Sequence, residues 1–157
     1  MAEGEFALVR KYSEIALGKT ATWIGEHDLY AMLVDAAAQQ GDAAGLEQYA
    51  PLAEELAVRY EHKLYQAIAQ RAWGVAHRLA GRAVEAEARL KQALELFETL
   101  DTRWQIGRTL FELGELALRS PTENEAAREY FSRALSAFEE MGAVPDATRT
   151  REKLATL

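Results

Sequence analysis

The stretch WGVAHRLAGRAVEAEARLKQALELFETL at residues 73–100 decides the fold, because its residue classes return forty positions away on both sides. Gly41 aligns with Gly81 at this spacing, and the next step falls on Pro121. A fixed period of this length indicates a stack of identical supersecondary units. The other aligned sets are Leu33, Trp73 and Leu113; Val34, Gly74 and Gly114; Ala53, Ala93 and Ala134; Ala57, Phe97 and Phe138; and Tyr60, Leu100 and Met141. The last member of the final three sets sits one residue late, which fits an insertion in the turn at 120–124.

The units themselves are predicted to be helical. Ala, Leu, Glu, Gln and Arg are abundant, apolar residues recur at spacings of three and four, and no stretch alternates with a period of two for long. We therefore expect an all-α solenoid of about three helical hairpins with a capping helix at each end, all in one domain that spans 1–157. The expected elements are an end helix at 5–17, repeats at about 22–60, 61–100 and 101–141, and a capping helix at 145–155.

The turns between the expected helices carry recognisable signals. Gly41 suits the left-handed position that ends a helix, and Asp42 can cap the next helix by accepting hydrogen bonds from its first N–H groups. Pro51 falls inside an expected helix, where its missing N–H should bend or restart the chain. The join at 60–62 contains neither Gly nor Pro, so the boundary there is the least defined.

Bulk properties exclude several classes of protein. The net charge is −7, and the basic residues are mixed with acidic ones, so no basic stripe is available for a nucleic-acid backbone. The absence of cysteine favours a reducing compartment. The longest apolar runs are too short to cross a bilayer, and the N-terminus has no basic segment before them. We expect a soluble cytoplasmic protein that binds neither membranes nor nucleic acid.

The spacing of small and large residues in the second and third units resembles the tetratricopeptide repeat (TPR). The residues that carry the resemblance are Trp73, Gly74, Gly81, Ala86, Leu90 and Ala93 in the second unit, and Leu113, Gly114, Ala127, Phe131 and Ala134 in the third. Gly and Ala allow two helices to approach closely while the large residues fill the space beside them. The period of forty is similar to a longer TPR subfamily found in bacterial signalling proteins, behind the ATPase modules of LuxR-type activators and behind nucleotide cyclases.

The resemblance implies a groove, because the first helix of each TPR unit lines the concave face of the stack. The implied groove residues are Asp28, Asp35, Arg71, Val75, Arg78, Arg108, Phe111, Glu115, Leu118 and Arg119. Arg71 and Arg78 lie seven residues apart, roughly 10 Å along a helix, which suits two acidic groups of a bound peptide. The alternative is that Asp35, one helix away, pairs with these arginines and leaves no ligand to bind. The sequence leaves both interpretations open.

The sequence contains little that indicates a catalytic or metal site. His77 occupies a packed position matched by Ala37 and Ala117, which favours a hydrogen-bonded core histidine. His27 and His62 lie near helix starts and are expected in solvent. No histidine pair has the helical spacing of a metal site, no serine has a nucleophile motif, and no Gly-rich phosphate loop is present. Helical spacing assigns Trp23, Trp73 and Trp104 to core filling. We expect no enzyme and no cofactor.

Three hypotheses about function follow. The first is a non-enzymatic adaptor or regulatory module that binds a protein or peptide segment, acidic segments included, through the concave face. The second is a self-association module of a larger bacterial signalling or transcription-regulatory protein, in which an end helix docks on a neighbouring copy. The third, a helical enzyme or small-molecule sensor, needs a closed pocket with paired ionisable groups around His77.

Overall fold

The computed structural model describes residues 3–18, 25–120 and 122–157, and these residues form eight α-helices and no strand. The helices are α1 (Glu3–Leu17), α2 (Glu26–Gln40), α3 (Ala43–Arg59), α4 (Lys63–Leu79), α5 (Ala83–Thr99), α6 (Arg103–Ala117), α7 (Asn124–Glu140) and α8 (Val144–Ala155). Thr22, where we expected the first repeat to begin, Trp23 and Pro121 lie outside the described residues. No described helix has the length and apolar character needed to cross a membrane.

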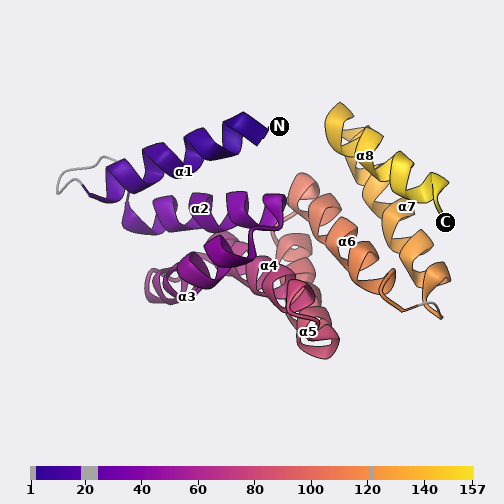
Figure 1. The fold of residues 1–157 in the computed structure, drawn as a ribbon, viewed down its shortest axis with the longest axis horizontal. Coiled ribbons are helices and arrows are strands. Elements are labelled where there is room, and N and C mark those ends of the chain that lie inside the picture. Colours follow the sequence, from indigo (N-terminus) through magenta and orange to yellow (C-terminus); the bar gives the residue numbers. More distant parts are fainter. Residues whose placement is uncertain (1–2, 19–24, 121) are drawn as a thin grey trace.

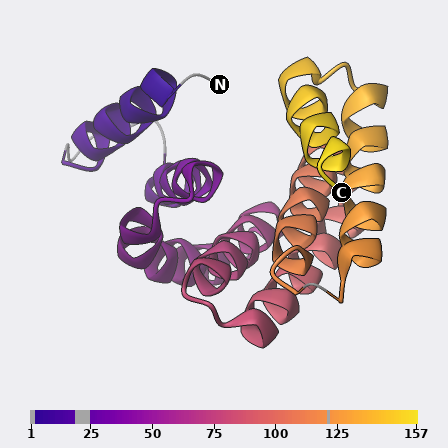
Figure 2. The ribbon, with the colours of Figure 1, turned by 45° about the vertical axis from the view of Figure 1, so that its right-hand side comes forward.

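The helices form a curved stack of antiparallel hairpins (Figure 1). The hairpins are α2–α3, α4–α5 and α6–α7, with α1 packed on α2 at one end and α8 packed on α7 at the other. Helices α2, α4 and α6 follow one another along the inner side of the curve, while α3, α5 and α7 form the outer layer (Figure 2). The arms that carry α1 and α8 face each other across the opening. The expected all-α, TPR-like helical repeat is confirmed.

Each hairpin is closed by a small residue set against a large one. A Cβ atom added to Gly74 would lie 2.5 Å from Cγ of Leu90, and one added to Gly114 would lie 2.7 Å from the ring of Phe131. These distances are far below van der Waals contact, so only glycine fits. In the first hairpin the equivalent positions hold Val34 and Ala50, both fully buried. The smaller residue of the pair is therefore on the second helix in this hairpin and on the first helix in the other two. The two side chains together fill a similar volume in each unit.

The helix ends follow one pattern, whether or not a glycine is present. Five helices end with a residue in the left-handed region, at Gly41, Gly81, Gly142, Glu61 and Asp101. At the join without Gly or Pro, Glu61 adopts φ 52°, and the N–H of His62 donates to the carbonyl of Ala57 at 3.0 Å. The residue that follows a left-handed glycine makes the same hydrogen bond at other helix ends, as the N–H of Arg82 does to the carbonyl of His77 at 2.9 Å. Asp42 caps α3 as expected, because its carboxylate accepts from the Gly45 N–H at 3.0 Å.

The expected restart at Pro51 is wrong. Helix α3 runs without interruption from Ala43 to Arg59 with Pro51 inside it. Proline removes a single backbone donor and crowds the carbonyl four residues before it. Both Pro51 and Glu47 are exposed, so water can solvate that carbonyl and the seven buried residues on the other face of α3 hold the helix together.

We predict that Gly74→Ala destabilises the protein by about 1–2 kcal/mol, because overpacking against Leu90 outweighs the better helix propensity of alanine. Urea unfolding measures this free energy. The double variant Gly74→Val with Leu90→Ala recreates the arrangement of Val34 and Ala50. It should therefore be more stable than Leu90→Ala alone, whose cavity remains unfilled. A neutral or stabilising Gly74→Ala substitution would contradict this account of the seam.

Candidate functional site on the concave face

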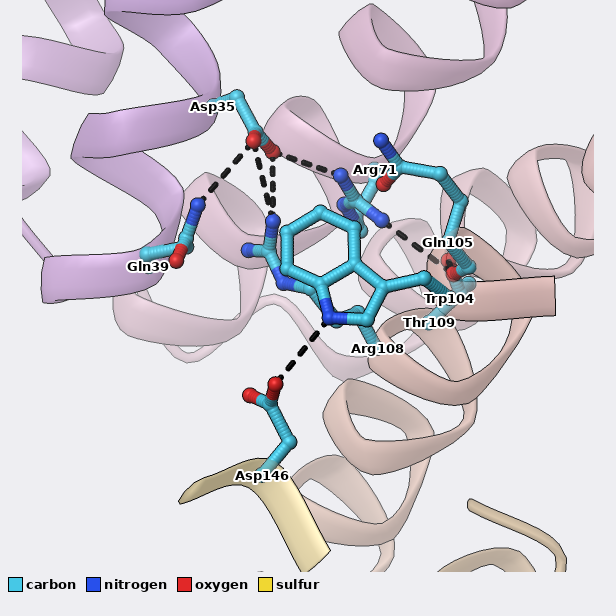
Figure 3. A network of polar contacts seen from close by, with 8 residues as sticks. All are labelled: Asp35, Gln39, Arg71, Trp104, Gln105, Arg108, Thr109 and Asp146. Carbon is cyan, nitrogen blue, oxygen red and sulfur yellow. Dashed lines mark hydrogen bonds and ion pairs between the residues drawn. The ribbon is translucent and has the colours of Figure 1, made fainter. Parts of the chain in front are cut away.

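One carboxylate on the inner side of the curve joins three helices. Asp35 on α2 accepts a hydrogen bond from Arg71 Nη2 on α4 at 2.6 Å (Figure 3). Arg108 Nη1 on α6 donates to both oxygens of Asp35, at 2.9 and 3.0 Å. Gln39, one turn further along α2, donates its side-chain amide to Asp35 Oδ2 at 3.1 Å. We call Asp35, Arg71 and Arg108 the inner triad.

The inner triad is largely shielded from water. The Arg71 side chain has 0% of its surface exposed, and that of Asp35 has 17%. Burial alone would raise the pKa of the Asp35 carboxyl, but the charges of Arg108 and Arg71 and their hydrogen bonds outweigh it and hold that pKa below its usual value. Burial and repulsion from Arg108 lower the pKa of Arg71 to about 10 against the attraction of Asp35, so its guanidinium remains charged at neutral pH.

The triad is anchored on both sides by other groups of the stack. Arg71 Nη1 donates to the backbone carbonyl of Gln105 at 3.3 Å, and its guanidinium lies 5.0 Å from the ring centroid of Phe97. Arg108 lies 4.8 Å from the ring centroid of Trp104, whose indole N–H donates to Asp146 on α8 at 3.1 Å. The polar network therefore extends from α2 to the capping helix α8 (Figure 3).

Two further ion pairs lie on the inner helices. Arg78 Nη2 on α4 donates to Glu112 on α6 at 2.6 Å, and both side chains are nearly buried. Glu115 on α6 lies 2.7 Å from Lys153 Nζ on α8. Each of these pairs links one unit to the next, so charges that face the opening neutralise one another across adjacent helices.

A cavity of about 320 Å³ opens beside the inner triad. Its lining comes from α1, α2, α6, α7 and α8, and consists of Phe6, Gln39, Arg108, Phe111, Glu112, Phe138, Pro145, Asp146 and Arg149. The Arg149 guanidinium lies 4.4 Å from the ring centroid of Phe111. Among the described residues no carboxylate lies within ion-pair distance of Arg149. We call this space the inner cavity.

The structure distributes the ten groove residues implied by the resemblance over several environments. Arg108 and Phe111 line the inner cavity. Arg71 and Val75 are completely buried, so in this arrangement neither can contact a ligand. Arg78 and Glu115 belong to the ion pairs just described. The sequence left open whether the groove charges bind a ligand or pair with one another. In the structure Asp35, Arg71 and Arg78 each pair with another charged group of the chain.

The remaining three groove residues lie away from the inner cavity. Asp28 accepts hydrogen bonds from the Tyr65 hydroxyl and from the Gly25 N–H. Leu118 is half-buried and packs against the core formed by α6, α7 and α8. Arg119 is exposed and lines a separate cavity of about 250 Å³ beside the start of α5.

Sequence reasoning missed the part of the inner cavity that the chain ends provide. Phe6, Phe138, Pro145, Asp146 and Arg149 were not among the groove residues. A signal for Arg149 exists: it stands forty-one residues after Arg108, which is the spacing of the third unit with its one-residue insertion. Extending the period one step further, into the capping helix, would have placed Arg149 on the inner face.

The histidines differ from expectation. Nδ1 of His77 is buried and has no hydrogen-bond partner among the described residues. The ring stacks on Trp73 instead, and burial together with Arg82 and Arg89 lowers the pKa of His77. His27 and His62 are half-buried rather than solvated, because the tight turn at Glu61 brings His62 onto the Tyr65 ring with centroids 3.8 Å apart.

The histidine rings and nearby acids do not form a metal site in the part of the chain that the structure describes, where no three His, Asp or Glu side chains are grouped to hold an ion. Trp73 and Trp104 are partly buried against the two main core clusters, as core-filling residues should be. Each also uses its indole N–H, Trp73 to Glu54 at 2.8 Å and Trp104 to Asp146.

We predict that Asp35→Asn destabilises the protein by about 3–5 kcal/mol, because it leaves the buried guanidinium of Arg71 and that of Arg108 without a counter-charge. Urea unfolding measures the loss. Glu55→Gln, which removes an exposed carboxylate 2.6 Å from Arg59, is the matched control and should change stability by less than about 0.5 kcal/mol. Equal effects of the two substitutions would contradict the importance of burial at Asp35.

The same carboxylate predicts a pH dependence. The pKa of Asp35 is lower in the folded protein than in the unfolded chain, where it is about 3.9. Its contribution is therefore complete above that value and is lost as the pH falls towards the folded pKa. The difference in unfolding free energy between the natural protein and Asp35→Asn, measured in urea from pH 7 to pH 3, should shrink below about pH 4. A difference that stays constant over this range would show that Asp35 carries no stabilising charge.

Comparison with known proteins agrees with the helical geometry. Residues 65–140, which run from the first turn of α4 to the end of α7, match the family model described as tetratricopeptide repeat. No curated protein and no solved structure matches the chain significantly. The matched segment contains the second and third hairpins, where the small-residue seams are strongest. Tetratricopeptide repeats generally mediate protein–protein interaction and are typically non-catalytic, and the match over these two hairpins supports a TPR protein.

Proposed function

We propose that this protein is a non-enzymatic adaptor or regulatory module that binds a segment of another protein in the inner cavity on its concave face. The observation that carries the proposal is the position of Arg149. Its guanidinium is packed on the Phe111 ring at the cavity wall, it is exposed, and no carboxylate of the described residues neutralises it. A charge held in place beside an aromatic ring without an internal partner is well placed for an external one.

The charges around the cavity favour an acidic ligand group. Arg71 and Arg108 share a single carboxylate, that of Asp35, whereas Arg78 has its own partner in Glu112. Asp146 accepts from the neutral indole of Trp104 and is the one lining anion with no arginine bonded to it. Counting Arg71, Arg78, Arg108 and Arg149 against Asp35, Glu112 and Asp146 gives four positive and three negative charges. A ligand carboxylate beside Arg149 would balance them.

The size of the cavity limits what enters it. A volume of about 320 Å³ is at the lower end of the range for ligand pockets, which suits one or two side chains of a longer segment that continues across the opening. Phe6, Phe111, Phe138 and Pro145 provide apolar walls. We therefore expect an acidic residue next to an apolar one, with Arg108 and Arg149 contacting the carboxylate and Phe111 contacting the apolar side chain. The buried charges behind them hold the wall in place.

The biological setting is also a proposal. The forty-residue period supports a role close to that of the longer bacterial TPR arrays in signalling or transcription regulation. The absence of cysteine supports a reducing cytoplasmic compartment. No G-x-S-x-G motif or Gly-rich phosphate loop occurs in the sequence, which is in keeping with binding rather than catalysis.

The test is selection from a random twelve-residue peptide library, followed by fluorescence anisotropy with the enriched peptides. We expect enriched peptides to contain an acidic residue beside an apolar one, and Arg149→Ala to weaken their binding by at least tenfold, since a charge-assisted hydrogen bond is lost. Arg128→Ala on the outer helix α7 is the control, because Arg128 is equally an exposed arginine without an acidic partner among the described residues. Enriched peptides that bind both variants like the natural protein would overturn the inner cavity as the binding site.

A further inference from the structure

The end helix α1 carries an exposed apolar stripe, and one of its members, Ile15, also borders a cavity between α1 and the first hairpin. Leu8, Tyr12 and Ile15 are 50%, 62% and 45% exposed, and their spacing of four and three residues places them on one face. Phe6 and Ser13, which are buried, lie on the opposite face of α1 towards α2. We call Leu8, Tyr12 and Ile15 the outer stripe. We propose that it is an interface through which two copies of this chain associate.

The internal repeat allows the outer stripe of α1 to be compared with the aligned positions of other helices. Phe6 aligns with Leu46, Ala86 and Ala127 at steps of forty, forty and forty-one, which makes α1 the counterpart of α3, α5 and α7. The counterparts of the outer stripe are Gln48, Leu52 and Glu55 in α3, Ala88, Gln92 and Glu95 in α5, and Glu129, Arg133 and Ser136 in α7. All nine are exposed, seven of them are polar, and Leu52 is the one large apolar side chain among them. Of these four helices, α1 alone places three large apolar side chains at the aligned positions.

A missing helix of the same stack does not account for the outer stripe. The faces of α3, α5 and α7 that join the stack are apolar, with Ala50, Leu90 and Phe131 at one aligned position, all fully buried. The counterpart in α1 is Arg10, which donates to Asp42 at 2.8 Å. The seam face of α1 thus carries a charge at this position, while three large apolar side chains lie exposed on the other side of the helix. A surface designed to meet water would not show this arrangement, which points to an occupant on the outer side.

A second copy fits the outer stripe better than other occupants. When two α1 helices are laid antiparallel with Tyr12 at the centre, Leu8 of each copy meets the turn that carries Ile15 of the other. Lys11 then lies near Glu14 of the other copy, so opposite charges flank the stripe, although the Glu14 carboxylate also accepts from the Tyr49 hydroxyl of its own chain. An anionic membrane is disfavoured, because α1 has three Glu against one Arg and one Lys and the whole chain carries −7. In both views α1 lies at the edge of the molecule (Figures 1 and 2).

The association is expected to be weak, since three side chains from each copy make an interface smaller than those of stable dimers. Light scattering or sedimentation equilibrium from micromolar to millimolar concentration should show a reversible monomer–dimer equilibrium. Tyr12→Glu should weaken the dimer at least tenfold, because it places two like charges opposite each other at the centre. The matched control is Leu52→Glu, which alters the aligned position in α3, where the side chain is 39% exposed. That variant should associate like the natural protein.

A cross-link identifies the surface directly, because the chain has no cysteine. Under mild oxidation Tyr12→Cys should form a disulfide-linked dimer much faster than Leu52→Cys. Both sites are exposed, so circular dichroism should show natural helix content in every variant. A protein that stays monomeric at millimolar concentration, a dimer that Tyr12→Glu leaves intact, or equal cross-linking at both sites would each overturn the proposal. None of these outcomes depends on peptide binding in the inner cavity.

Discussion

The shared carboxylate of Asp35 is the interaction on which the concave face depends. It is bonded to α4 and α6 at once, although Asp35 and Arg108 are 73 residues apart. Helices α2 and α6 belong to the first and third hairpins, which make almost no other contact. Moving either helix away from the other would leave a guanidinium or a carboxylate buried without its partner, and such groups are costly. Asp35 is therefore the group that bonds the first and third units to each other directly, while both units also pack on the middle hairpin.

Two kinds of constraint act in this stack, one within each hairpin and one between units. The seams between a small and a large residue fix how the two helices of a hairpin pack, because a Cβ atom has no room at Gly74 or Gly114. They act between neighbours and say nothing about how far the stack curves. The inner triad and the pair of Arg78 with Glu112 act between units. Replacing a buried ion pair with apolar residues is often neutral for stability, so the role that we assign to these charges is to specify the geometry of the inner surface.

The repeating parts of the fold could be predicted from the sequence alone. Helical periodicity, the left-handed Gly41 and the Asp42 cap are local signals. The end helices expected at 5–17 and 145–155 are observed as Glu3–Leu17 and Val144–Ala155. The restart expected at Pro51 was wrong because the breaking effect of proline was weighed without the seven buried residues that hold α3 together. The turn at Glu61 was hard to locate, since a glutamate gives no sign that it will adopt a left-handed conformation.

The inner surface was less predictable, because its pairs join residues from different units. The pattern placed Asp35, Arg71 and Arg108 on inward-facing helices, but whether they pair or remain open is decided by distances between helices that no local signal contains. Arg149 and Phe6 were missed because the implied groove was taken only from the first helices of the three full units and left out both end helices. The outer stripe on α1 became visible only when exposure could be compared at aligned positions.

The most direct test of this account is a double-mutant cycle between Asp35 and Arg108, with Asp35→Asn, Arg108→Gln and the double variant compared by urea unfolding. If the carboxylate holds the first and third units together, the two substitutions are strongly non-additive, with a coupling energy of more than about 1.5 kcal/mol. Additivity within about 0.5 kcal/mol would mean that the two helices keep their places without this bond, and would contradict the central claim.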